Sequence, residues 1–262
     1  MEPDDEMEDA GPRFAPPSQE QVGWRALCLH AGVIRALFEQ LYQLVGDPKP
    51  PEAAGLPPRV TALGQWMTAE GVREHLSPVE RGWFATPLGE WEQQQVLDGS
   101  WRKESLGVLL WALSVLDRLP PYDREFPEDV HYDNIGWLQS ASSFFERVGL
   151  RQHDEIAHAR VVAELWHWRA RTRQLQEMDP NTRRVPRDFN FEKIIRQAAE
   201  IAHQAGDIPK PIKRDFPAFG KPYARLTREE YSIATSIAME RHFALNWLCG
   251  YSEDWDSTPT DT

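Results

Sequence analysis

The stretch Leu106-Gly-Val-Leu-Leu-Trp-Ala-Leu-Ser-Val-Leu116 decides the fold class of this chain. As a helix it is apolar nearly all the way round, so it has no polar face to turn towards water, and other helices must cover it. We expect a helix capped by Ser100 that runs from Trp101 to about Asp117 at the centre of a bundle. Pro120-Pro121 stops that helix.

Regular spacing of apolar residues predicts helices on both sides of this segment. From Ser18, which has capping-box spacing with Gln21, apolar residues recur every three or four positions to Val45. Thr227 and Glu230 form a second box. Further helices are expected at 133–148, 151–177, 190–205 and 228–249, with short helical pieces from Ser77-Pro78 and Thr86-Pro87 after a proline-rich loop over 47–58. No stretch alternates as a strand does, so the prediction is an all-α, single multi-helix bundle.

The net charge of −12 on these 262 residues is concentrated at the two ends. Residues 1–13 carry six acids and one arginine, and residues 252–262 carry four acids. The rest of the chain is close to neutral, which argues against a nucleic-acid or anionic-membrane surface because both need a basic field. We expect a disordered acidic tail over 1–17, followed by a helical domain over 18–262.

Residues 178–226 form a basic, proline-rich excursion from this domain. They contain ten basic and six acidic side chains, a net charge of +4, and one expected helix. The excursion is either a solvated surface or a docking site for the chain's own acidic tail or an acidic partner.

The expected location is the cytoplasm. Cys28 and Cys249 are two isolated thiols within apolar helical patterns, which favours a reducing compartment over a disulfide framework. The amino terminus is acidic and lacks the regions of a signal peptide, and the longest apolar run is too short to cross a bilayer.

Motifs for catalysis or for a cofactor are not recognisable in the sequence. Glu-x-x-His, the helical unit of di-iron bundles, occurs at Glu155/His158, Glu164/His167 and Glu200/His203. The first two pairs are nine residues apart and face opposite sides of one helix, and the third faces water on its own helix. We therefore expect no metal site and no cofactor.

Arg241 lies near the centre of the apolar face of the last helix. A buried guanidinium needs a carboxylate or several carbonyls, and the nearby candidates are Asp254, Asp256 and Asp261. This places the carboxyl-terminal tail back on the last helix with Trp255 buried. The alternative is that Arg241 extends along the helix to solvent.

The many tryptophans suggest one candidate pocket. Trp166, Trp168 and Trp247 would wall it, and His167 would supply a titratable group. The alternative is that these tryptophans are core residues around a hydrogen-bonded histidine. The full set of candidate ligand or partner residues is Glu155, Trp166, His167, Trp168, Arg241, Asn246, Trp247, Trp255, Asp256 and Asp261.

Three stretches together resemble a bacterial family known as domain of unknown function 4272. They are Trp101 to Leu113 with Leu119-Pro120, Leu150-Arg151 through Glu155 to His167-Trp168, and Glu240 to Leu248 with the closing Asp254-Trp-Asp256 and Asp261-Thr262. The resemblance covers about 20–176 and 227–262, and it implies a helical, soluble protein without an established activity. The excursion is longer than the link usual in that family.

Two functions remain open at this point. The first is a non-enzymatic module that binds a protein partner or a small molecule. The second is an enzyme or small-molecule binder that uses the Trp-walled pocket around His167 and Arg241.

Overall fold

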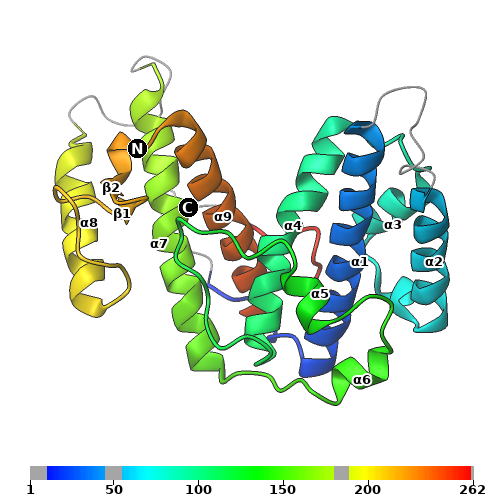
Figure 1. The fold of residues 1–262 in the computed structure, drawn as a ribbon. Coiled ribbons are helices and arrows are strands. Elements are labelled where there is room, and N and C mark those ends of the chain that lie inside the picture. The colour runs from blue at the N-terminus through cyan, green and yellow to red at the C-terminus, as the bar shows by residue number, and fades with distance from the viewer. Residues whose placement is uncertain (1–10, 45–54, 180–188, 261–262) are drawn as a thin grey trace, which may run out of the picture.

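The computed structural model describes residues 11–44, 55–179 and 189–260, and helices make up most of these ranges (Figure 1). The all-α prediction is confirmed. The α-helices are α1 (Gln19–Leu44), α2 (Leu56–Ala69), α3 (Pro78–Ala85), α4 (Gln93–Ala112), α5 (Val130–Asn134), α6 (Ala141–Phe145), α7 (His153–Glu177), α8 (Phe191–Ala205) and α9 (Arg228–Leu248). Two 3-10 helices, η2 (Val72–His75) and η3 (Tyr223–Arg225), and the two-residue strands β1 (Pro217–Ala218) and β2 (Lys221–Pro222) complete the described elements.

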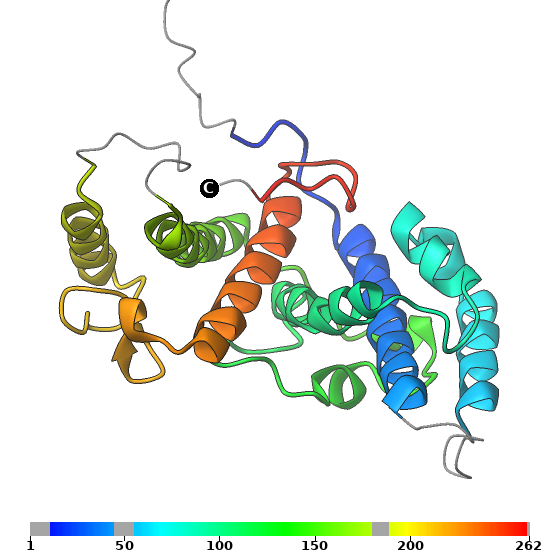
Figure 2. The same cartoon turned by 90° about the horizontal axis from the view of Figure 1, so that it is seen from above.

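The long helices form a row in the order α2, α1, α4, α9, α7 and α8 (Figures 1 and 2). α4 lies in the middle and packs on α1 on one side and on α9 on the other. Leu106, Val108, Leu109 and Leu110 have no exposed surface, as the apolar stretch predicts. None of the helices in the described ranges is long and apolar enough to cross a bilayer.

Two of the predicted helix starts are correct in detail. The Ser18 N–H donates to the Gln21 side chain at 2.7 Å, and the Gln21 N–H donates back to the Ser18 hydroxyl at 3.3 Å. Thr227 and Glu230 form the same reciprocal box at the start of α9. These boxes satisfy N–H groups that have no partner inside the helix, which is why they can be recognised from the sequence.

The predicted limits of α4 are wrong at both ends. The helix begins at Gln93, where Glu92 and Gln95 form the capping box, and Ser100 lies inside it. The Ser100 hydroxyl donates to the Val96 carbonyl at 2.7 Å, so it is satisfied within the helix and caps nothing. α4 ends at Ala112 rather than near Asp117, because the chain turns at Ser114, whose φ is +58°.

Three other boundaries also differ from the prediction. Thr86 ends α3 instead of starting a helix, since its N–H and hydroxyl both donate to the Gly82 carbonyl. The helix expected at 133–148 is the pair α5 and α6, separated by the positive φ angles of Gly136 and Leu138. α2 begins inside the expected 47–58 loop, because its prolines occupy the first turn, where an N–H is not required. Residues 45–54 lie outside the described residues.

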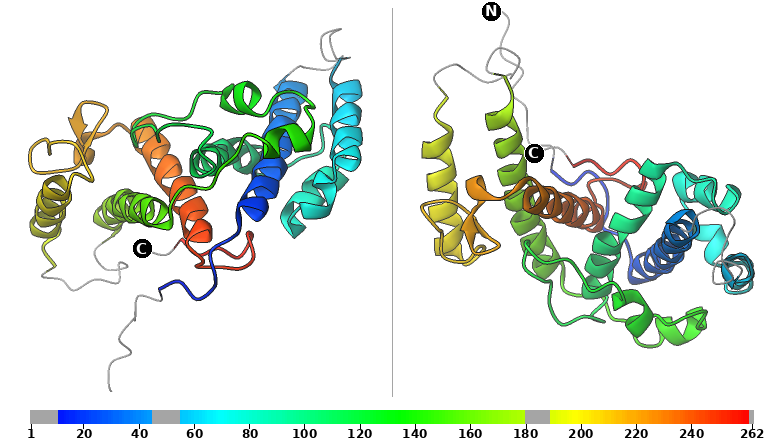
Figure 3. Two further views of the ribbon diagram at one scale, coloured as in Figure 1. Left: turned by 90° about the horizontal axis from the view of Figure 1, so that it is seen from below. Right: turned by 45° about the horizontal axis from the view of Figure 1, so that its top comes forward.

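The two ends of the described chain meet beside the carboxyl end of α9 (Figures 2 and 3). The N–H groups of Arg13 and Phe14 donate to the Gly250 carbonyl at 3.1 and 3.0 Å. Gly250 has a φ of +80°, and a Cβ there would lie 2.3 Å from the Phe14 carbonyl oxygen. Of the acidic tail expected over 1–17, residues 1–10 lie outside the described residues.

The excursion after α7 packs on that helix through α8 and a hairpin (Figure 1). α8 turns Phe191, Ile195, Ala199 and Ala202 inward. After α8 in the chain, β1 and β2 pair antiparallel. Asp215 fastens this region to the bundle, because its carboxylate accepts two bonds from the buried Arg169 of α7, at 2.6 and 2.8 Å.

Candidate functional site

Arg241 is buried, as predicted, but its partner is not on the tail. Its guanidinium has no exposed surface and pairs with Glu104 of α4, with Nη2 2.8 Å from Oε2. The Pro120 and Arg124 carbonyls accept from the same group at 2.6 and 2.8 Å. Burial raises the pKa of Glu104, against the attraction of Arg241 and the Phe126 N–H. The expected pairing with Asp254 or Asp256 is wrong because α4 crosses α9 at this point, and Asp261 lies outside the described residues.

His167 belongs to a buried pair of histidines between α7 and α9. Its Nδ1 lies 3.1 Å from Nδ1 of His242, and His30 of α1 makes the same contact with His131 of α5. Burial, with the neighbouring histidine, lowers the pKa of both His30 and His242 to about 3, and burial lowers that of His131 to about 4. His30, His131 and His242 therefore stay neutral near pH 7. The two histidine pairs join α1 to α5 and α7 to α9.

The three tryptophans predicted to line one pocket do not lie together in the structure. Trp166 is a core residue that stacks on Tyr122, with ring centroids 5.3 Å apart, and Trp168 packs near Phe216. Trp247 lies elsewhere, at the end of α9, edge-on to Trp255. The alternative interpretation of Trp166 as a core residue describes its place better than the pocket interpretation does.

The carboxyl-terminal tail does fold back on α9, through contacts of its own. Trp255 is 4% exposed and packs edge-on against Phe243 and Trp247. Asn246 is buried and donates to the Pro259 carbonyl at 2.8 Å. Asp256 accepts from the Val79 N–H at 2.9 Å, so it satisfies a free N–H at the start of α3 instead of pairing with Arg241.

The Glu-x-x-His residues do not converge. Glu155 is exposed and pairs with Arg151, while Glu200 and His203 are exposed on α8. Glu164 pairs with Arg160 on its own helix. Within the described residues, no three side chains of His, Cys, Asp or Glu are grouped so as to hold a metal ion.

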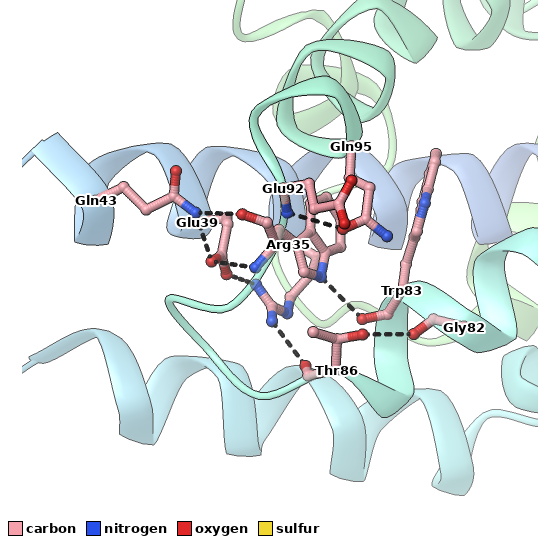
Figure 4. Close-up of polar contacts among 9 residues, drawn as sticks. Arg35, Glu39, Gln43, Gly82, Trp83, Thr86, Glu92 and Gln95 are labelled. Atoms are coloured by element: carbon pink, nitrogen blue, oxygen red, sulfur yellow. Dashed lines mark hydrogen bonds and ion pairs between the residues drawn. The ribbon is translucent and has the colours of Figure 1, made fainter.

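A buried polar cluster on α1 was not foreseen from the sequence (Figure 4). Arg35 pairs with Glu39, and both side chains are essentially unexposed. The Arg35 guanidinium also donates to the Thr86 carbonyl at 3.0 Å, and Glu39 accepts from the Trp91 N–H at 3.1 Å. Burial raises the pKa of Glu39, but the bonds from Arg35 and the nearby backbone outweigh it and leave the pKa lowered.

This cluster acts as a clamp. Gln43 extends it by bonding both Glu39 and the Trp91 carbonyl, at 3.0 and 2.8 Å. Together the three α1 side chains fix the segment that joins α3 to α4. Their spacing of four residues, on one face of a helix, is the signal that could have identified them.

Two adjoining hollows on the surface share Trp24, and we call them together the Trp24 groove. One, of about 360 Å³, lies between α1, α3 and the tail, and the other, of about 600 Å³, lies between α1, α2 and α6. Trp24 is half-buried, stacks on His75 with centroids 4.2 Å apart and meets Phe145 edge-on at 4.9 Å. Trp247 and Trp255, both from the predicted set, line the first hollow.

Acidic side chains predominate around the Trp24 groove. The carboxylates that line its two hollows are Glu20, Glu70, Glu146, Glu253 and Asp254. Two arginines lie among them. Arg25 is buried and ion-paired with Glu80, and only Arg81 is an exposed arginine. The groove therefore combines an aromatic floor with a negatively charged rim.

Fold and site together define an all-α protein whose helices are joined by buried arginine–carboxylate pairs and which carries an aromatic groove on its surface. A family model described as a domain of unknown function (DUF4272) matches residues 10–188, and the chain belongs to this family. The match ends at residue 188, before α8, so most of the excursion and all of α9 lie beyond it. No curated protein and no solved structure matches the chain.

Proposed function

We propose that this protein is a binding module, without catalysis, that takes a basic and partly apolar peptide segment of a partner into the Trp24 groove. The observation that carries the proposal is the position of Trp24. It is half-buried and lines both hollows, so its exposed surface adjoins space that a partner can fill. A few residues dominate the binding free energy of protein interfaces, and tryptophan is enriched among them.

The charge of the groove supports a basic partner. Glu20, Glu146 and Glu253 are exposed, and within the described residues their carboxylates have no cationic partner. Lysine and arginine side chains can lie along apolar surface while their charges reach such a rim. A cation placed over a tryptophan face adds a further attraction.

The buried polar groups support binding over catalysis. Arg241, Arg35 and Arg169 are each fully buried against a carboxylate that fixes them in the fold. Burial also raises the pKa of Cys28 to about 12 and that of Cys249 to about 11, so neither thiol is activated. Such unreactive thiols fit a reducing compartment, and we place the protein in the cytoplasm.

The test is an array of 12-residue peptides that alternate Lys or Arg with Leu or Phe, beside the same array with Glu in place of each basic residue. We expect the basic array to bind and Trp24→Ala to weaken binding at least tenfold. Trp137→Ala, which removes an exposed aromatic outside the groove, serves as the control.

A second variant guards against a folding defect in Trp24→Ala. Glu146→Lys combined with Glu253→Lys reverses two exposed charges and should weaken binding while leaving the melting temperature unchanged. Equal binding of the acidic array, or full binding by both variants, would contradict the proposal.

A further inference from the structure

A strained turn at the end of the molecule opposite the groove presents two basic side chains. Ile212 and Asp215 pair across it through two backbone bonds of 3.1 and 3.0 Å. Its central residues, Lys213 and Arg214, have φ angles of +49° and +67°. Two positive φ angles define a type I′ turn, for which Asn-Gly is the favoured sequence. The backbone conformation of the turn therefore does not by itself explain why lysine and arginine occupy these two positions.

Hydrogen bonds to the buried Asp215 hold this turn in place against the bundle. Asp215 is buried and bonded to Arg169 through both carboxylate oxygens. The same carboxylate accepts from the N–H groups of Phe216 and Ala224, each at 2.8 Å. Strained residues persist where the surrounding structure over-determines them, and they gather at functional positions.

The turn lies in a group of unpaired cations. Lys210, Lys213, Arg214 and Arg225 are exposed, and none of them meets an acidic side chain in the described parts of the chain. Arg225 directly follows Ala224, whose N–H is bonded to the Asp215 carboxylate, so its backbone lies near the turn. We propose that this basic turn is a docking surface for an acidic protein segment, separate from the Trp24 groove.

The acidic segment in this proposal belongs to another protein molecule. β1 directly follows the turn and lies near the beginning of α9 (Figure 1). Arg13 is bonded to Gly250 just beyond the other end of α9, a helix of 21 residues and about 30 Å. The chain's own amino-terminal segment is therefore anchored at the opposite end of α9 from the turn.

The first experiment titrates the whole protein with a peptide of the sequence MEPDDEMEDA, using calorimetry at 50 mM salt. The control peptide has Gln and Asn in place of its acids. We expect only the acidic peptide to bind, and we expect Lys213→Glu with Arg214→Glu to weaken it at least tenfold. Raising the salt to 300 mM should weaken binding of the acidic peptide to the unaltered protein, since exposed charges are screened.

A second variant separates docking from a structural role of the turn. Lys213→Asn with Arg214→Gly installs the favoured turn sequence, so the melting temperature should stay level or rise by about 2–4 °C. Peptide binding should nevertheless fall at least tenfold. A fall in melting temperature would show that the two side chains serve the fold, and would overturn the inference.

Two further results would overturn it. One is equal binding of the acidic and amide peptides to the unaltered protein. The other is tighter binding of a duplex DNA of equal charge, lost on Lys213→Glu with Arg214→Glu, which would assign the surface to nucleic acid. Neither result bears on the Trp24 groove, because the groove and the turn have no residue in common.

Discussion

Arg241 of α9 and Glu104 of α4 form an ion pair with no exposed surface on either side chain. Their backbones are 137 residues apart in sequence, and the pair joins the two central helices of the row. It also fixes the connection after α4, through the carbonyls of Pro120 and Arg124. The pair is therefore a central constraint on how the bundle assembles.

Loss of one partner of this pair should be costly. Arg241→Met leaves Glu104 buried without its cation and should lower the free energy of unfolding by about 3–5 kcal/mol. The double variant with Glu104→Leu should lose less than the sum of the two single changes. Urea denaturation measures all three. Glu155→Gln, at an exposed pair, is the control and should change stability by less than about 1 kcal/mol. Strict additivity would contradict the coupling.

Stability should decrease as the pH falls below about 6.5. His30, His131 and His242 have lowered pKa values in the folded protein, so the unfolded chain binds more protons between pH 6.5 and about 4. Each histidine that is protonated only in the unfolded chain lowers the free energy of unfolding by about 1.4 kcal/mol per pH unit once the pH is well below 6.5. Urea midpoints from pH 7.5 to 5 measure the slope.

The variants for this pH test are a double change and a surface control. His30→Leu with His131→Leu removes two of the titrating groups and should make the slope shallower, whatever its effect on stability at pH 7.5. His203→Asn changes an exposed histidine and should leave the slope unchanged. An unaltered slope in the double variant would contradict the assignment.

The carboxyl-terminal tail should be required for full stability. Trp255→Ala removes a buried ring from between Phe243 and Trp247 and should cost about 3–5 kcal/mol. Asp256→Ala leaves the Val79 N–H without its acceptor and should cost about 0.5–2 kcal/mol. Glu253→Ala, on the exposed part of the tail, is the control. A chain ending at Gly250 that melts within a degree of the full chain would contradict this role.

Gly250 should tolerate alanine less well than Gly220 does. Both have positive φ angles, +80° and +70°, so both substitutions introduce a similar backbone strain. A Cβ at Gly250 also meets the Phe14 carbonyl at 2.3 Å, whereas one at Gly220 meets nothing within 4 Å. We expect a larger fall in melting temperature for Gly250→Ala, with faster proteolysis before Ser18. Equal losses would show that the contact with Phe14 contributes nothing.

The presence of the long helices and the central place of α4 could be predicted from the sequence alone. Capping boxes such as Ser18/Gln21 and Thr227/Glu230 involve residues three apart, and apolar spacing repeats within a single turn. Both signals involve residues that are close in sequence, so they can be recognised without knowledge of the fold. They failed where a side chain had a second local option, as at Ser100, whose hydroxyl bonds its own helix.

The partners of the buried polar groups and the place of each tryptophan depend on the tertiary structure. The sequence indicates that Arg241 is buried and needs an acid, but the choice of Glu104 over Asp254 or Asp256 depends on which helices cross. The same holds for Trp24, which becomes a surface feature because α2, α3, α6 and the tail surround it without covering it. The physical reason is that such contacts join distant segments, and helix periodicity carries no information about which distant segments meet.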